Sequence, residues 1–181
     1  EALTAGSGVL QHFRYPATIS VHDLAVMMIA LSDNTATNML IDLVSMPEVN
    51  SLLSAHCFVK TRLRRKMIDS VAASTGHENT GTPLELVRFL TLLYNGEIVS
   101  PQVSKNTIEL LKVPKQGAMN QGLQETGVVM ANKPGGMEGV TVDAGIVFLP
   151  RRPFAMCVMA NYTLESRVTE EVGEMFKLVY D

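Results

Sequence analysis

Apolar residues recur every three or four positions through the first two thirds of the chain, and this spacing predicts a cluster of helices. Ser20 stands at the start of the first of them, where its hydroxyl would accept a backbone N–H. Thr82 and Ser100 each stand before a proline, a combination typical of the first turn of a helix. The predicted helices are 19–31, 35–44, 47–56, 83–96 and 100–113.

The pattern changes after about residue 126, where short β-rich runs alternate with Gly, Pro and Arg turn signals. We expect strands at 127–133, 140–150 and 152–162, close enough together to form an antiparallel meander. The stretch 164–181 is amphipathic and predicts a final helix packed on one face of that sheet. Helices and strands are segregated, so the predicted fold class is α+β.

This order of elements predicts two lobes. Residues 1–125 would form a helical lobe, and residues 126–181 a sheet lobe with the last helix. The stretch 60–82 has no sustained period and is rich in Ser, Thr, Gly and Asn, so we expect a long, irregular, omega-type loop. Within it, Glu78 is expected to be a solvated residue.

Ser32, Asp33 and Asn34 separate the first two predicted helices. One interpretation is structural, because the side chains of these residues cap helix starts. The other is catalytic, with a Ser-x-Asn element in a helix–helix loop. The three residues alone do not decide between the two.

Composition narrows the function classes. The formal net charge is −3 and the longest basic stretch, which contains Arg-Leu-Arg-Arg at 62–65 and ends at Lys66, is short, which weighs against nucleic-acid binding. No apolar run is long enough to span a membrane. The four histidines show no metal-ligand spacing, so no metal and no cofactor is expected. Cys57 and Cys157 are expected to be buried free thiols.

A second motif favours the catalytic interpretation. Lys133 closes a predicted strand and is followed by Pro134, Gly135 and Gly136. Together with the Ser-Asp-Asn element, this pattern resembles the class A β-lactamases and penicillin-binding serine hydrolases. The stretches that carry the resemblance, in order, are GSGVLQ, SDNTATNMLID, TRLRRKMID, NTGTP, NKPGG and DAGIVFLPRRPFAMCVMANY.

The resemblance covers nearly the whole chain and implies a β-lactamase/transpeptidase-like fold. It also implies a role for each matching residue. Ser32 would relay a proton to the leaving nitrogen, and Asn34 would hold a nucleophile-side lysine and contact the substrate. Lys133 would supply a positive field for the substrate carboxylate, Gly135 would let the substrate approach, and Gly136 would donate its N–H to the oxyanion.

The nucleophile that the resemblance requires does not occur in these residues. No serine of the chain has a lysine three positions later. In the family this motif precedes the Ser-Asp-Asn loop, so we expect it upstream of Glu1, in a longer or processed protein.

The long loop also departs from the family pattern. Its Arg matches Arg65, but Met67 stands where β-lactamases carry the glutamate that activates the deacylating water. A thioether is no base. Asp69 is either a substitute base or a loop hydrogen-bond acceptor. Asn79 stands where the family places the partner of that Arg, and it carries no charge for an ion pair.

Two anchors of the substrate carboxylate are missing as well. Pro134 replaces the hydroxyl residue that follows the lysine in the family, and the strand 140–147 holds no Arg. Both losses weaken the case for a β-lactam as the natural substrate.

The sequence thus predicts a serine hydrolase that acts through an acyl-serine intermediate on a β-lactam or a related amide or ester, with slow deacylation. Two alternatives remain: a non-catalytic or acyl-trapping penicillin-binding module, and a D-alanyl carboxypeptidase or esterase on the same scaffold. The expected partners are a small-molecule substrate and the upstream segment, with no nucleic acid. The resemblance alone implies an extracytoplasmic location and a link to antibiotic resistance.

Overall fold

The computed structural model describes residues 3–162 and 165–181, and the chain forms two compact units, Glu1–Gly81 and Thr82–Asp181. The two units are defined by the contacts within each of them. The predicted lobes, 1–125 and 126–181, are divided instead where helices give way to strands in the sequence, and they stay a prediction. Each unit is described by itself below.

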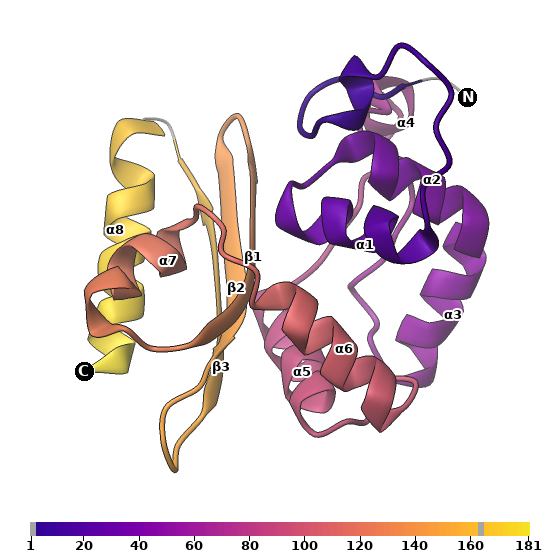
Figure 1. The fold of residues 1–181 in the computed structure, drawn as a ribbon. Helices are drawn as coiled ribbons and strands as arrows, with labels where there is room; N and C mark the ends of the chain where they lie inside the picture. Colours follow the sequence, from indigo (N-terminus) through magenta and orange to yellow (C-terminus); the bar gives the residue numbers. More distant parts are fainter. Residues whose placement is uncertain (1–2, 163–164) are drawn as a thin grey trace. The chain divides into compact units, whose positions relative to one another are not determined.

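The first unit is built from helices (Figure 1). Three of them occupy the segments in which the apolar spacing predicted helices. The Ser20 hydroxyl accepts the N–H of Asp23 at the start of α1, as predicted. Leu10, Leu24 and Ala36 form one buried apolar cluster of this unit. Its elements are η1 (Leu10–His12), α1 (Val21–Ala30), α2 (Asn34–Val44), α3 (Met46–Ala55) and α4 (Ser70–Ser74).

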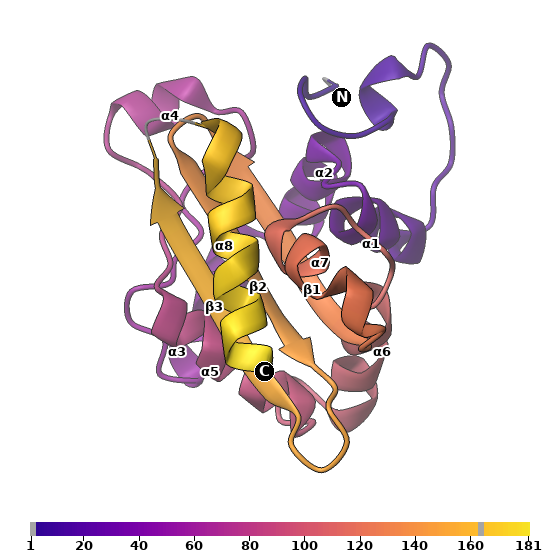
Figure 2. The ribbon, with the colours of Figure 1, turned by 90° about the vertical axis from the view of Figure 1, so that its left-hand side faces the viewer.

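The second unit is a three-stranded antiparallel sheet in the order β1-β2-β3, which confirms the predicted meander. Helices α5 and α6 pack on one face, and α7 and α8 pack on the other (Figures 1 and 2). Its elements are α5 (Pro83–Tyr94), α6 (Pro101–Leu111), α7 (Ala118–Leu123), η2 (Gln124–Thr126), β1 (Met130–Met137), β2 (Val140–Val147), β3 (Phe154–Asn161) and α8 (Glu165–Tyr180).

Local capping sets where α5 and α6 begin. The Thr82 hydroxyl accepts the N–H of Glu85, and the Ser100 hydroxyl accepts the N–H of Val103, both as predicted. Helix α7 was not predicted, because its six residues are too few for a visible period and Gly117 supplies no side-chain cap. A bond from a distant strand replaces the cap and is described below.

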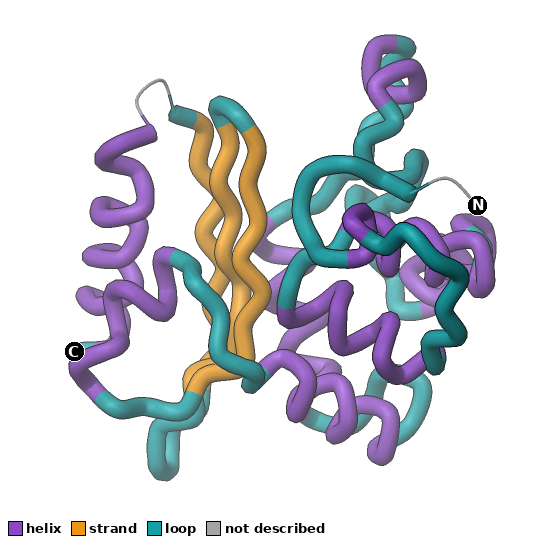
Figure 3. The backbone as a smooth tube through the Cα atoms, turned by 45° about the horizontal axis from the view of Figure 1, so that its top comes forward, coloured by secondary structure: helices purple, strands orange, loops and turns teal. Residues whose placement is uncertain are grey.

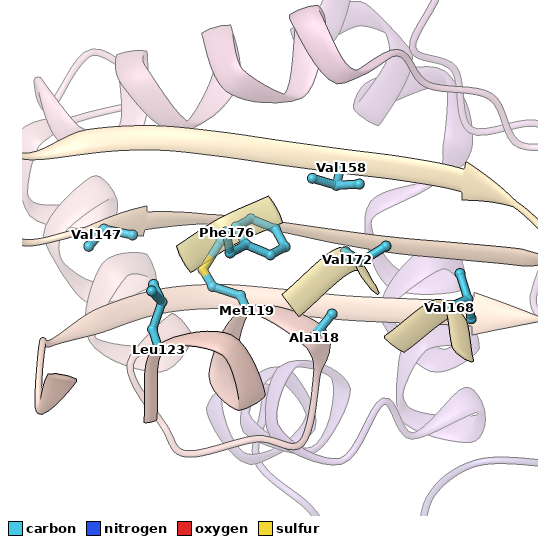
Figure 4. Packing of buried hydrophobic residues seen from close by; sticks show 8 residues of the cluster. All are labelled: Ala118, Met119, Leu123, Val147, Val158, Val168, Val172 and Phe176. Carbon is cyan, nitrogen blue, oxygen red and sulfur yellow. The ribbon is translucent and has the colours of Figure 1, made fainter. Parts of the chain in front are cut away.

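The C-terminal helix covers one face of the sheet, as expected. Leu164, the first residue of the predicted helix, lies outside the described residues. The apolar stripe of α8 packs with α7 and the strands in one cluster (Figure 4). Met175 and Val179 continue the apolar spacing of this helix but are 49% and 52% exposed, so the buried stripe is narrower than the apolar pattern. The buried members are Ala118, Met119, Leu123, Val147, Val158, Val168, Val172 and Phe176.

One strand differs from its predicted extent. Lys133 was expected near the end of a strand, but β1 continues through Pro134 and both glycines to Met137. Backbone pairing with β2 explains the extension, since Met137 pairs with Val140 next to the connecting turn. Proline is tolerated because β1 lies at the edge of the described sheet, where one side of the strand carries no ladder bonds.

The expectation of two buried thiols is wrong for Cys57, which is exposed at the end of α3. Cys157 is half-buried in β3, and burial raises the pKa of its thiol to about 11. No helix in residues 3–162 and 165–181 combines the length and apolar character needed to cross a membrane.

We expect Gly122→Ala to destabilise the protein by about 1–3 kcal/mol, because a Cβ there would overlap the Gly173 carbonyl oxygen where α7 meets α8. Chemical denaturation measures the free energy of unfolding. Gln121→Ala is the control, because Gln121 is exposed on the same helix. Equal stability of both variants would contradict the close α7–α8 contact.

Candidate active site

A buried carboxylate organises the Ser-Asp-Asn turn. Asp33 is 1% exposed, and its Oδ2 accepts the N–H groups of Val9 and Leu10 at 2.7 and 2.9 Å. Its Oδ1 accepts the N–H of Ala36 at 2.9 Å and caps α2. A buried charge is costly unless such donors surround it, so these three bonds hold the turn to the start of η1 and to the first turn of α2.

Ser32 adopts an unusual backbone conformation in this turn, with φ of 51°. A serine in the left-handed region costs of order 1 kcal/mol and persists where neighbouring contacts fix it. The contacts are present on both sides. The backbone N–H of Asp33 donates to the Met27 carbonyl, and the Ser7 hydroxyl donates to the Leu31 carbonyl.

Asn34 is held by the N-terminal segment. Its Nδ2 donates to the Ala5 carbonyl at 2.9 Å, and its backbone N–H donates to the Ser7 carbonyl at 3.1 Å. Gly8 has φ of +102°, and a Cβ there would overlap Asp33. The segment therefore needs glycine at position 8 to lie this close to the turn.

One turn further along α2, Asn38 joins the turn to the long loop. Its Oδ1 accepts the Met67 N–H at 2.7 Å, and its Nδ2 donates to the Met67 carbonyl at 3.2 Å. The backbone of Met67 is thus fixed against the helix that begins at Asn34. Asn38 belongs to none of the sequence motifs described above; the signal for it in the sequence is the four-residue spacing from Asn34, which places both on one helix face.

The ends of the long loop are tied together, as its family resemblance implies. Arg62 and Thr80 form an isolated antiparallel bridge. The Asn79 Oδ1 accepts the N–H groups of Arg64 and Arg65 at 2.7 and 3.0 Å, and its Nδ2 donates to the Arg65 carbonyl. Asn79 therefore needs no charge, because it binds the backbone and not a guanidinium.

The expectation that Glu78 is merely solvated is wrong. Its Oε1 lies 2.6 Å from Arg65 Nη2 and 2.7 Å from Nε. The hydrogen bond from Arg65 lowers the pKa of the Glu78 carboxyl. The guanidinium is 12% exposed, and the carboxylate 44%. Arg65 thus forms its ion pair with the residue before Asn79, the position at which the resemblance placed the partner of this arginine.

Asp69 has a structural role as a helix cap. Its Oδ1 accepts the N–H of Ala72 at 2.9 Å and caps α4, a short helix inside the stretch predicted to be irregular. This contact agrees with the loop-acceptor interpretation of Asp69. The sequence did not reveal the helix because five residues hold little more than one turn.

In the second unit, Lys133 lies in the middle of β1 and is half-buried. Its Nζ donates to the Pro134 carbonyl at 2.9 Å. Burial lowers the pKa of its ammonium, and the charge of Asp143 opposes that shift. Gly135 and Gly136 follow it and are exposed, and a Cβ at Gly135 would meet no atom within 4 Å.

Asp143 is a second buried carboxylate, 1% exposed, on β2. Its Oδ2 accepts the Met119 N–H at 2.9 Å, which is the bond that starts α7. Its Oδ1 accepts Asn132 Nδ2 at 3.0 Å, and that nitrogen also donates to Asn120 Oδ1. Burial raises the pKa of Asp143 despite these donors. The residue before Lys133 is thereby fixed.

The structure groups the predicted residues into two sets. Ser32 and Asn34 lie in the first unit with all four loop candidates, Arg65, Met67, Asp69 and Asn79. Lys133 and the two glycines lie in the second unit. Their roles in one catalytic site stay predictions. Among residues 3–162 and 165–181, no cluster of His, Cys, Asp and Glu side chains could hold a metal ion.

Comparison with known proteins addresses the family and the fold of the chain. A family model described as the beta-lactamase enzyme family matches residues 1–181. No match was found among curated proteins. PBP-A aligns with a TM-score of 0.85 and 24% identity over 98% of this chain and 66% of its own. A beta-lactamase from Sphaerobacter thermophilus DSM 20745 gives the same TM-score and identity, with 98% and 68% covered.

A class A beta-lactamase from Mycobacterium abscessus aligns with a TM-score of 0.77 and 23% identity, over 90% of this chain and 64% of its own. The chain therefore spans about two thirds of the length of the solved structures it matches. The predicted fold class, α+β of the β-lactamase/transpeptidase type, is confirmed.

We expect Asn79→Ala to loosen the long loop more than Glu78→Gln does. Asn79 satisfies three backbone groups, whereas the Arg65–Glu78 pair is partly exposed and screened by salt. Hydrogen exchange of the Arg64 and Arg65 amides measures the difference. Faster exchange in Glu78→Gln than in Asn79→Ala would show that the ion pair dominates.

Proposed function

Because the chain belongs to the beta-lactamase enzyme family, we propose that it acts as a serine hydrolase on a β-lactam or a related amide or ester. The reaction would pass through a covalent acyl-serine intermediate. The observation that carries the proposal is the Ser32 turn, held in the left-handed region by the three donors to Asp33. Strained backbone that is fixed from several sides is typical of active sites.

In this proposal Ser32 transfers a proton to the leaving nitrogen, and Asn34 orients the substrate. Both need a fixed position, since acyl transfer depends on aligned donors and acceptors. Bonds from the segment before η1 to Asn34 and to Leu31, the residue before Ser32, support such a fixed position. The nucleophile is assigned to a segment outside residues 1–181, because no serine in them is followed by lysine three positions later.

Lys133 supplies a cation beside the reacting centre, and the Gly136 N–H stabilises the oxyanion. Burial supports this role for Lys133, because a charge acts more strongly where water is excluded. The open space beside Gly135 supports the passage of a substrate along β1.

Deacylation would be slow. Met67 occupies the loop position at which the family carries a glutamate, and it offers no basic atom. Its backbone is clamped by Asn38, and Asp69 Oδ1 is engaged by the Ala72 N–H. Neither residue supports activation of a hydrolytic water.

The loss of this base favours an acyl-trapping penicillin-binding module as the second candidate. A D-alanyl carboxypeptidase or esterase would use the same residues on another acyl donor.

The proposal places the protein outside the cytoplasm, where such substrates lie, and a role in antibiotic resistance requires turnover of the drug.

The test uses the full-length protein and a chromogenic cephalosporin. We expect one burst of product and a persistent covalent adduct in the mass spectrum. Lys133→Ala should reduce the acylation rate by on the order of 100-fold, as removal of one stabilising donor does elsewhere, with little loss of stability. Lys177→Ala, an exposed lysine of α8, is the control. Absence of both product and adduct with the unaltered protein would refute the proposal, and steady turnover without an adduct would refute slow deacylation.

Met67→Glu tests the missing base separately. If the clamped Met67 backbone places a carboxylate toward the acyl group, deacylation should accelerate by on the order of 100-fold, a typical contribution of a general base. The decay of the adduct mass measures it. Val71→Glu adds the same charge at an exposed loop residue and should have no effect. Equal behaviour of both variants would mean that position 67 is not the base position.

A further inference from the structure

The connection between α6 and α7 lies along β1 in the second unit (Figure 3). Its Gly117 is so close that a Cβ would come within 2.7 Å of the Pro134 Cβ and of the Asp143 Oδ2. The residues just before Gly117 therefore lie next to the part of β1 that carries Lys133. Lys115 stands two positions before this contact.

Lys115 is half-buried and its ammonium group is only partly satisfied. Its Nζ donates to the carbonyls of Leu111 and Val113, at 2.8 and 2.5 Å, at the C-terminal end of α6. An ammonium group has three hydrogens to donate. Within residues 3–162 and 165–181, no carboxylate oxygen comes within 4.0 Å of this nitrogen, the longest distance for an ion pair.

The surroundings of Lys115 disfavour its positive charge, because Lys133 is a cation nearby. Burial, together with repulsion by Lys133, lowers the pKa of Lys115 to about 8, and the charge of Asp143 opposes both effects. Asp143 already accepts the Met119 N–H and the Asn132 amide. The six residues of α7 carry no titratable group, and the Cys157 thiol on β3, with its raised pKa, is neutral.

The charged neighbours on α6 do not neutralise Lys115. Glu109 binds Lys112 at 2.8 Å, and the Lys112 ammonium lies 4.9 Å from the ring centre of Phe148. An anion that approached β1 would therefore relieve the repulsion between Lys115 and Lys133 and occupy the remaining donor of Lys115.

We propose that Lys115, together with Lys133, forms a subsite on β1 that binds the carboxylate of the substrate. The inference rests on the proposed function, and it gives that site a residue outside the recognised motifs. Pro134 offers no hydroxyl to a carboxylate, and β2 contains no arginine. Lys115, in the connection between α6 and α7, supplies a cation in place of that arginine. The proposed binding involves no covalent step.

The subsite depends on pH. Lys115 binds an anion only when protonated, so the affinity for a carboxylate is fully present below about pH 8 and falls above it. A bound anion favours the protonated form and raises the pKa of Lys115. A substrate without a carboxylate should show no such dependence on Lys115.

The first test compares a β-lactam with its carboxylate methyl ester on the full-length protein. Lys115→Gln keeps a donor for the α6 carbonyls but removes the charge. It should lower the second-order acylation rate for the free acid by about 10- to 100-fold, as for a lost hydrogen bond to a charged group, and leave the ester unchanged. Lys115→Arg should restore the preference, and Lys105→Gln, an exposed lysine of α6, should not alter it. Equal loss for acid and ester would overturn the subsite.

The second test needs no acylation. The pKa of Lys115 is followed by NMR of ¹³C-labelled lysine side chains during titration with acetate at constant ionic strength. We expect the pKa to rise with acetate while that of Lys105 stays constant. An unchanged Lys115 pKa would overturn the inference even if acylation is observed. If no β-lactam acylates the protein, the proposed function fails and this titration alone decides the subsite.

Discussion

The carboxylate of Asp33 is the interaction on which the Ser-Asp-Asn turn depends. It is buried, and it accepts two N–H groups from the N-terminal end of η1 and one from the first turn of α2. An ionised group in such a place is stable only while its donors remain, so the three segments have to move together. Ser32 precedes Asp33, and its left-handed backbone follows from that constraint.

The second unit repeats this solution with Asp143. This carboxylate also accepts an N–H from the first turn of a helix, here Met119 of α7, and its other oxygen holds Asn132 on β1. In both units a buried acid fixes the backbone next to a residue with a proposed chemical role: Ser32 beside Asp33, and Lys133 beside Asn132. The positions of the proposed site residues thus depend on two buried carboxylates, which the pattern of hydrophobic positions does not reveal.

Local signals predicted much of the fold. Apolar spacing gave five helices, and the caps at Ser20, Thr82 and Ser100 formed as expected because each bond spans three residues. What was missed depends on long-range partners. Helix α7 starts on a bond to a residue 24 positions away, and Glu78 binds an arginine 13 positions away. The motif residues of the site were visible in the sequence, whereas the contacts that hold them became visible only in the structure.

The central claim is that one buried charge builds the turn that carries Ser32. Amide hydrogen exchange of Asp33→Asn tests it most directly, with Asp42→Asn as the control, because Asp42 is exposed and pairs with Lys66. The account predicts that the amides of Val9, Leu10 and Ala36 lose protection together in Asp33→Asn and keep it in the control. Retained protection of all three amides in Asp33→Asn would contradict it.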